Sequence, residues 1–408
     1  MKKLVLFAAA AMLAIAPAAN AADKVFVGHL RDYTGATAFV GKHYGPGVLD
    51  ALNYIIKEGG AVGKLMEFES VDYSYKIPQA VAQYNKWRAR DGGMTALQGW
   101  GTGDTEALIS FVARDQIPTF SASYSGHLTD PTGINPATKK PAPYNFFYGP
   151  SYSDGCRALV QWAFDDWQKI GDGNKPKFVH AGANHPYPEA PKKACAEYAA
   201  ELGFEVLPPV VVSMKPGDFK AQCLTMQEQG TNYAFLANLG GSVVSLLKSC
   251  ATVGTTFKFL GNIWAGDRLT MESAGEGAAM HFVAATPFWT SDAPGMKLVH
   301  AIAGSDDFRP HHYIRGVCSA FYMKEAMEWA LENNGEITGA GIKQGMYART
   351  NWVPKGLEGV CIPSTWTEKD HRGTMRVNVY SGVVKNGKAE VSKVAETTLP
   401  RREDWLGF

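Results

Sequence analysis

The sequence of 408 residues lacks the imbalances that mark several classes of protein. Its 40 lysines and arginines face 39 acidic residues, so no positive surplus indicates a nucleic-acid partner. With 43 glycines and 22 prolines it is neither collagen nor a disordered low-complexity chain. Beyond the N-terminus no run of 18 uncharged apolar residues occurs, so we expect no membrane-spanning helix. We therefore expect a soluble globular protein with a large core.

Signatures of catalysis and of nucleotide binding are also missing. Gly99, Gly101 and Gly103 form G-x-G-x-G, but Asp104 stands where the last glycine of G-x-G-x-x-G belongs. There is no Walker A loop and no G-x-S-x-G nucleophile motif. The adjacent histidines 311 and 312 would point about 100° apart on a helix, so we expect that they do not share a metal. We predict no catalytic activity, no cofactor and no metal, because an enzyme on a similar sheet would need a catalytic residue set.

The N-terminus has the pattern of a cleaved export signal. Lys2 and Lys3 precede the apolar run 4–15, and Ala19-Asn20-Ala21 fits the A-x-A cleavage rule. About 12 apolar residues are too few to cross a bilayer of about 30 Å as a helix. We therefore predict a signal peptide at residues 1–21 and a mature protein exported to the periplasm.

The chain has six cysteines and no C-x-x-C motif, and no cysteine and histidine cluster has zinc spacing. Export exposes a chain to oxidising conditions, which permit disulfides. Six cysteines in so long a chain are too sparse for a disulfide scaffold, so the residues alone leave open how many form bridges and how many are buried thiols.

Strand-like and helix-like segments alternate along the mature chain. Apolar strand-like runs are found at 25–27, 65–71, 95–98, 117–121, 177–181, 206–212, 233–237, 257–260 and 375–384. Helical spacing is found at 45–57, 78–89, 106–112, 158–170, 189–202, 218–228, 242–251 and 312–331. Two such series predict an α/β protein with two doubly wound, Rossmann-like lobes and a ligand cleft at the carboxyl ends of the strands. The proline-rich segment 129–144 is expected to be a surface loop.

Two turns rich in glycine and hydroxyl groups follow predicted strands. The first spans residues 98–105 and opens a helix, whose N-terminus favours an anion. The second spans residues 121–125. Either turn alone is compatible with plain helix capping, whereas two turns aimed at one cleft would form a cradle for a carboxylate.

An ordered series of segments resembles one known family. These segments are Thr34-Gly35-Ala36 with Gly41, the runs 59–64 and 78–82, Lys215-Pro216-Gly217-Asp218-Phe219, and GTTFKFLG at 254–261. Together they are similar to the periplasmic substrate-binding proteins of ABC transporters, in the branch typified by the leucine/isoleucine/valine-binding protein. The resemblance covers most of the mature chain, with 129–144 as an insertion.

This resemblance implies two lobes joined by a three-strand hinge. Lobe 1 would comprise residues 22–125 and 287–352, and lobe 2 residues 126–286 and 353–408. The ligand would bind by cleft closure and be delivered to a membrane permease by a monomeric protein with no nucleic-acid partner. Within lobe 2 it suggests the disulfides Cys156–Cys195 and Cys223–Cys250. Cys318 and Cys361 would lie on different lobes, so we expect that they do not pair.

The resemblance also implies how a ligand is held. Thr102 on the first turn, with Ala122 and Ser123 on the second, would bind its carboxylate, and Tyr187 would close over it from the other lobe. Arg315 is open to two interpretations, as a second carboxylate partner or as one half of a structural ion pair.

The sequence departs from the amino-acid binders of that family at the place of their acidic residue. Ile263 or Trp264 stands where a carboxylate would hold the ligand ammonium, and Asp267 lies three residues further on. Burying an ammonium without a partner is costly. Phe39, Trp100, Tyr187 and Trp264 would instead bring aromatic rings into the cleft. We therefore predict a small aromatic or apolar acid; the alternatives are an amino-acid-binding protein of the same fold and a soluble periplasmic sensor.

Overall fold

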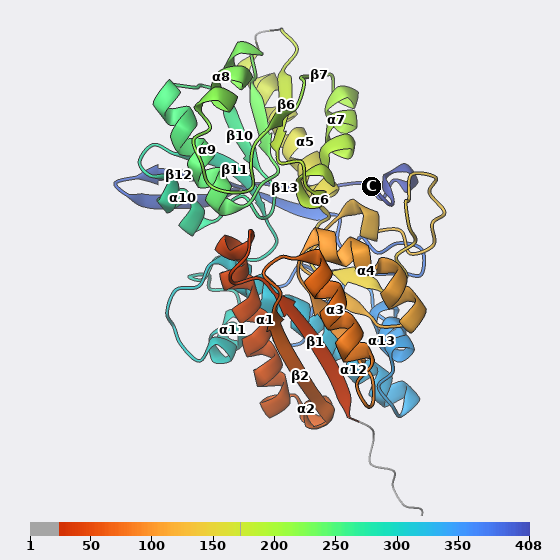
Figure 1. Cartoon of the computed structure of the whole chain (residues 1–408). Coiled ribbons are helices and arrows are strands. Elements are labelled where there is room, and N and C mark those ends of the chain that lie inside the picture. Colours follow the sequence, from red (N-terminus) through yellow and green to blue (C-terminus); the bar gives the residue numbers. More distant parts are fainter. Residues whose placement is uncertain (1–23, 172) are drawn as a thin grey trace, which may run out of the picture.

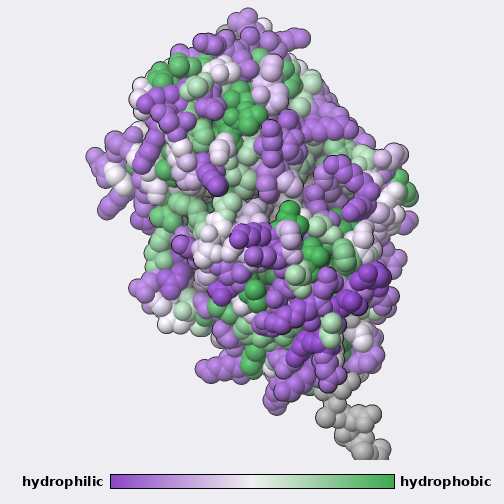
Figure 2. All heavy atoms as spheres, in the orientation of Figure 1, coloured by the Kyte–Doolittle hydropathy of each residue, from purple (hydrophilic) through white to green (hydrophobic). Residues whose placement is uncertain are grey.

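The computed structural model describes residues 24–171 and 173–408. The predicted signal peptide, residues 1–21, lies outside the described residues. The described chain forms two α/β lobes, one above the other in Figure 1, which confirms the predicted fold class. None of the helices within these ranges is both long and apolar enough to cross a membrane. On the face shown in Figure 2, hydrophilic side chains cover most of the surface.

The first lobe is built on a parallel sheet of five strands, in the order β2-β1-β3-β4-β5. Its strands are β1 (Val25–Arg31), β2 (Met66–Asp72), β3 (Ala96–Gly99), β4 (Thr119–Ser121) and β5 (Asn145–Phe147). Its helices are α1 (Ala38–Glu58), α2 (Gly60–Leu65), α3 (Ile77–Arg88), α4 (Thr102–Asp115), α11 (Met296–Ala303), α12 (His311–Asn334) and α13 (Gly339–Tyr347). The last three return from late in the sequence, and α12 packs along α1.

The second lobe contains an eight-stranded sheet in the order β13-β12-β11-β10-β9-β6-β7, with β8 also paired to β6. Its strands are β6 (Lys177–Gly182), β7 (Glu205–Val206), β8 (Val210–Val211), β9 (Tyr233–Leu236), β10 (Lys258–Gly261), β11 (Ala279–Ala284), β12 (Arg376–Lys385) and β13 (Lys388–Thr398). Its helices are α5 (Tyr152–Ile170), α6 (Pro186–Glu189), α7 (Lys192–Glu201), α8 (Lys220–Glu228), α9 (Gly240–Val253) and α10 (Arg268–Ala274). Strand β12 runs antiparallel to both of its neighbours, β11 and β13, whereas the other paired strands of this sheet are parallel.

The first sheet continues beyond the boundary predicted at residue 125. β5 pairs in parallel with β4, so the chain stays with the first sheet to Phe147. The intervening segment is the predicted loop, and Asp130 organises it by accepting hydrogen bonds from the backbone N–H groups of Thr132, Gly133 and Asn135. The Asn135 amide then donates to the Leu406 carbonyl, so this loop holds the C-terminal segment.

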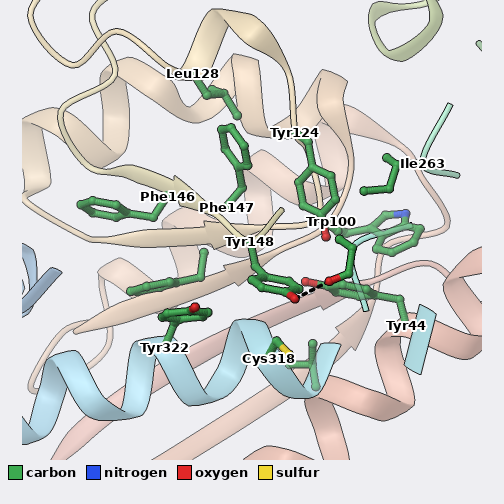
Figure 3. Packing of buried hydrophobic residues seen from close by; sticks show 14 of the residues in the cluster. Tyr44, Trp100, Tyr124, Leu128, Phe146, Phe147, Tyr148, Ile263, Cys318 and Tyr322 are labelled. Carbon is green, nitrogen blue, oxygen red and sulfur yellow. Dashed lines mark hydrogen bonds between the residues drawn. The ribbon is translucent and has the colours of Figure 1, made fainter. Parts of the chain in front are cut away.

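Tyr148 joins the segments that pass between the lobes. Its hydroxyl donates to the Ala285 carbonyl at 2.5 Å and accepts from the Ile362 backbone N–H at 2.8 Å. Its ring stacks on Tyr322 of α12, with centroids 5.6 Å apart, as Figure 3 shows. Three stretches distant in sequence thus meet at one buried phenol.

All six cysteines are paired. The bridges Cys156–Cys195 and Cys223–Cys250 confirm two predictions. The prediction that Cys318 and Cys361 do not pair is wrong, because the structure has this third bridge. The assignment of Cys361 to the second lobe caused the error. The chain after Trp352 folds back onto α12, where the Tyr322 hydroxyl bonds the Trp352 and Ile362 carbonyls. The bridge therefore fastens this returning segment to α12.

Candidate functional site

A small cavity lies between the lobes at the carboxyl ends of their strands. Its volume is about 20 Å³, which is room for roughly one water molecule. The lobes are therefore closed on each other. The lining residues are Thr37, Tyr75, Trp100, Gly101, Thr102, Ala122, Tyr152, Tyr187, Leu239 and Trp264. No charged side chain belongs to this set.

The first turn brings Thr102 to the cavity at the N-terminus of α4. Its side-chain oxygen accepts a hydrogen bond from the Ser123 hydroxyl at 3.1 Å and lies 3.5 Å from the Tyr152 hydroxyl. The backbone N–H groups of the first helical turn have no partners within the helix, and the helix dipole makes this end favourable for negative charge. Thr102 is thus placed to bind an anion with its hydroxyl and its own backbone.

Tyr75 now occupies the space in front of this helix end. Burial raises the pKa of Tyr75 well above its usual value, and the adjacent Thr102 backbone opposes this rise. Ser74 and Tyr75 both have left-handed backbones, with φ of 52° and 54°, a strained pair for residues other than glycine. Gly101 is required beneath the ring, because a Cβ there would lie 2.1 Å from Tyr75 Cε2. Tyr75 was not among the predicted site residues.

The second turn contributes differently from the predicted cradle. Ala122 lines the cavity, but its backbone N–H donates a hydrogen bond to the Gly99 carbonyl at 3.1 Å. Its carbonyl accepts a hydrogen bond from the Tyr152 hydroxyl at 3.3 Å. Ser123 is fully buried behind Thr102 and is not among the lining residues. The second turn therefore orients Thr102 and Tyr152.

The second lobe supplies aromatic walls. Trp264 donates its indole N–H to the Tyr152 hydroxyl at 3.1 Å, and its ring packs edge-on against Trp100 of the first lobe. Tyr187 packs edge-on against Tyr152, and its hydroxyl donates to the Asn238 carbonyl at 3.2 Å. Sequence analysis also missed Tyr152, because it placed the start of α5 six residues too late. The Ser151 cap, which bonds the Asp154 N–H, marks the true start.

Phe39 lies outside the cavity, although it was expected in the cleft. It sits at the start of α1 and faces Gly240 and Gly241 at the start of α9 on the other lobe. Trp100 does line the cavity, and its indole N–H is bonded to Thr37 at 2.7 Å. Phe39 is therefore a contact between the closed lobes.

Behind Trp264 lies Arg315 on α12. Its guanidinium carbon is 3.7 Å from the centroid of the Trp264 ring, and the residue is wholly buried. One of its terminal nitrogens donates to Nδ1 of His312, while Nε and Nη1 have no hydrogen-bond partner in residues 24–171 and 173–408. Leaving such groups unpaired costs about 1–3 kcal/mol, and more for a charged group.

His311 and His312 lie closer together than their helical positions suggested. Their ring centroids are 4.5 Å apart, and their nitrogens lie within 4.8 Å of each other and of the Asp267 carboxylate. The geometric reason for excluding a shared metal was therefore wrong. Burial lowers the pKa of His312 well below its usual value, so its ring is neutral. Because Arg315 donates to Nδ1, the proton resides on Nε2, 3.2 Å from Asp267. Nε2 of His312 and both ring nitrogens of His311 have no hydrogen-bond partner among the described residues, so only the contact between Arg315 and His312 is a hydrogen bond here.

Asp104 in the first turn of α4 makes stability depend on pH. Burial raises its pKa to about 7, although the Tyr73 hydroxyl and the Gly101 N–H donate to it. Between pH 4 and 7 the folded state then holds one more proton than the unfolded state, so the free energy of unfolding falls as pH rises through this range. We expect Asp104→Asn to gain on the order of 3 kcal/mol relative to the wild type between pH 5 and 8. The free energies of unfolding of the two proteins, measured in urea at pH 5 and at pH 8, test this gain. If both free energies change equally between these pH values, the expectation is wrong.

Comparisons with known proteins identify related chains. The family model described as periplasmic binding protein matches residues 24–388. The chain is similar in structure to an ABC transporter substrate-binding protein of Aeropyrum pernix, at 23% identity and a TM-score of 0.79, covering 94% of this chain and 98% of that one. It is also similar to a branched-chain amino acid ABC transporter protein of Thermus thermophilus with bound valine, at 20% identity and a TM-score of 0.78, covering 92% and 96%. A solute-binding protein of R. palustris in complex with benzoate matches at 16% identity and a TM-score of 0.72, covering 94% and 99%. No curated protein sequence matches.

Proposed function

The chain belongs to the periplasmic binding protein family, and on this premise we propose that it captures a small carboxylate between its lobes and delivers it to an ABC permease. The family match agrees with the predicted resemblance and with a binding protein in place of an enzyme. The finer proposal is that the ligand is an aromatic or other apolar acid. The protein would act as a monomer in the periplasm.

The observation that carries the carboxylate proposal is the N-terminus of α4 at the cavity. Thr102 offers a hydroxyl and a helix-end N–H in a cavity wall without a competing negative side chain. The ligand carboxylate would take the place of the Tyr75 hydroxyl at the Thr102 N–H. Displacement of the Tyr75 side chain would both free the anion site and enlarge the cavity.

The chemistry of the remaining wall supports an apolar ligand body. Tyr75, Trp100, Tyr152, Tyr187 and Trp264 present aromatic rings, which stack on planar groups. An α-amino acid would need an acceptor for its ammonium, and no carboxylate lines the cavity. The bound benzoate in the R. palustris protein shows that a related fold accepts an aromatic acid, whereas the T. thermophilus protein holds valine.

The motion would follow from the crossings between the lobes. Because the ligand touches both lobes only when they are closed, binding would shift the population toward the closed form that a permease recognises. The hinge would lie where the chain leaves the first sheet after Phe147, and again near Ala285 and the segment that follows Ile362, all close to Tyr148.

Titration calorimetry of the purified mature protein tests the ligand class. We expect benzoate and cinnamate to bind with micromolar affinity or better and leucine not to bind. Trp100 and Trp264 line the cavity, so the same titration should change tryptophan fluorescence. Tight binding of leucine with no response to aromatic acids would overturn the proposal.

A further inference from the structure

Arg315 is a buried cation whose charge the closed structure leaves incompletely balanced. It is wholly buried, and its Nε and Nη1 atoms have no hydrogen-bond partner among the described residues. The ring centroid of Tyr124 lies 5.8 Å from its guanidinium carbon, and Arg315 forms no ion pair with an acid within the described part of the chain. The carboxylate of Asp267 lies 3.2 Å from Nε2 of His312, on the far side of that ring from Arg315, without forming a hydrogen bond to it.

A second unpartnered polar group lies beside this cation. The Tyr124 hydroxyl is fully buried without a hydrogen-bond partner, and the Tyr124 ring centroid is 5.8 Å from the Arg315 guanidinium. A guanidinium has its donors in a fixed fork that matches the two oxygens of a carboxylate. Two arginine nitrogens and a phenol hydroxyl without partners therefore offer the hydrogen bonds that a carboxylate accepts.

One side chain separates this group from the cavity. Trp264 lines the cavity and also stacks on Arg315 at 3.7 Å. It stands on the short irregular segment between β10 and α10, and its indole N–H makes one hydrogen bond, to Tyr152. Since the cavity holds about one water molecule, a ligand must displace part of the wall. Displacement of the indole would enlarge the cavity and uncover the guanidinium in one movement.

We infer that the ligand is a dicarboxylate, with one carboxylate at Thr102 and the other paired with Arg315 in the place that Trp264 now covers. This inference rests on the proposed carboxylate-binding function and makes Arg315 the residue that selects for a second acid group. Thr102 contacts Tyr152, whereas Arg315 stacks on Trp264, and these two aromatic side chains are hydrogen-bonded to each other. A spacer would therefore separate the two carboxylates of the ligand.

Calorimetry with matched pairs of acids tests the inference. The probes are benzoate against terephthalate and hexanoate against adipate. We expect the better diacid to bind the wild type at least tenfold more tightly than its monoacid. Arg315→Gln should reduce that ratio to less than threefold while leaving the monoacid affinity unchanged. Arg309→Gln removes a charge near the same end of α12, outside the cavity lining, and should preserve the ratio.

A milder variant covers the case in which Arg315→Gln does not fold. Tyr124→Phe removes only the unpartnered hydroxyl and should lower diacid affinity several-fold with no effect on monoacids. Equal loss of both acids in the Arg315 or Tyr124 variants would show a structural role and overturn the inference, as would a wild type that binds monoacids as tightly as diacids. If no acid of either kind binds, the proposed carboxylate function fails as well.

Discussion

Thr102→Val should weaken carboxylate binding about 10- to 100-fold, because a hydrogen bond to a charged group contributes about 1.5–3 kcal/mol. The Thr102 hydroxyl is buried at the cavity and is held in place by Ser123. Valine keeps the branched shape and leaves the Ser123 hydroxyl without its acceptor, so the loss falls on the polar contacts. Calorimetric titration with benzoate measures the change.

Thr105→Val is the matched control. Thr105 lies one turn further along α4, is buried with an unpartnered hydroxyl, and does not line the cavity. Its replacement should leave affinity unchanged, and Thr102→Ser should retain most of the binding because the hydroxyl is kept. If Thr102→Val bound acids like the wild type, the anion would not lie at the N-terminus of α4.

The helices and strands that could be predicted from sequence are those whose own residues show the apolar pattern typical of that structure. Strand β9 is a short apolar run that is buried at every position, and helix α12 shows a long helical spacing. The turn after β3 was predictable because glycine and threonine between a strand and a helix favour a helix N-terminus. Strand β13 has no such signal, because its residues are mostly exposed and it forms only through its pairing with β12.

The parts of the site that were missed depend on contacts between distant segments. Tyr75 follows β2 in a turn without glycine, and nothing local predicts two successive left-handed residues there. Its role exists only because Gly101 and His185, from both lobes, pack against its ring. The bridge between Cys318 and Cys361 was missed for a related reason, since the return of the second cysteine's segment to α12 depends on contacts with Tyr322. The Ser151 cap, in contrast, was a local signal for Tyr152 that the analysis overlooked.

Gly241→Trp should weaken ligand binding about 100-fold or more by holding the lobes apart. Gly241 lies at the start of α9, and a Cβ there would face Phe39 of the other lobe at 3.4–3.6 Å, with no other heavy atom among its three nearest neighbours. Alanine would make an ordinary contact, whereas an indole at this position would press against Phe39 of the other lobe. Apparent affinity falls in proportion to the population of the binding-competent state, so a hundredfold loss of the closed form gives a hundredfold weaker Kd.

Two further variants make this test specific to closure. Gly241→Ala should bind within about twofold of the wild type, because its methyl group fits beside Phe39. Phe39→Ala combined with Gly241→Trp should restore much of the binding, since the two side chains are opposed across the lobes and their effects are then not additive. Small-angle scattering with saturating ligand should show the single Gly241→Trp variant more extended than the double variant. The expectation is wrong if the Gly241→Trp protein binds the ligand and compacts like the wild type. The ligand would then be held without the contact between Phe39 and α9. The closed arrangement of the lobes would not be the binding-competent one.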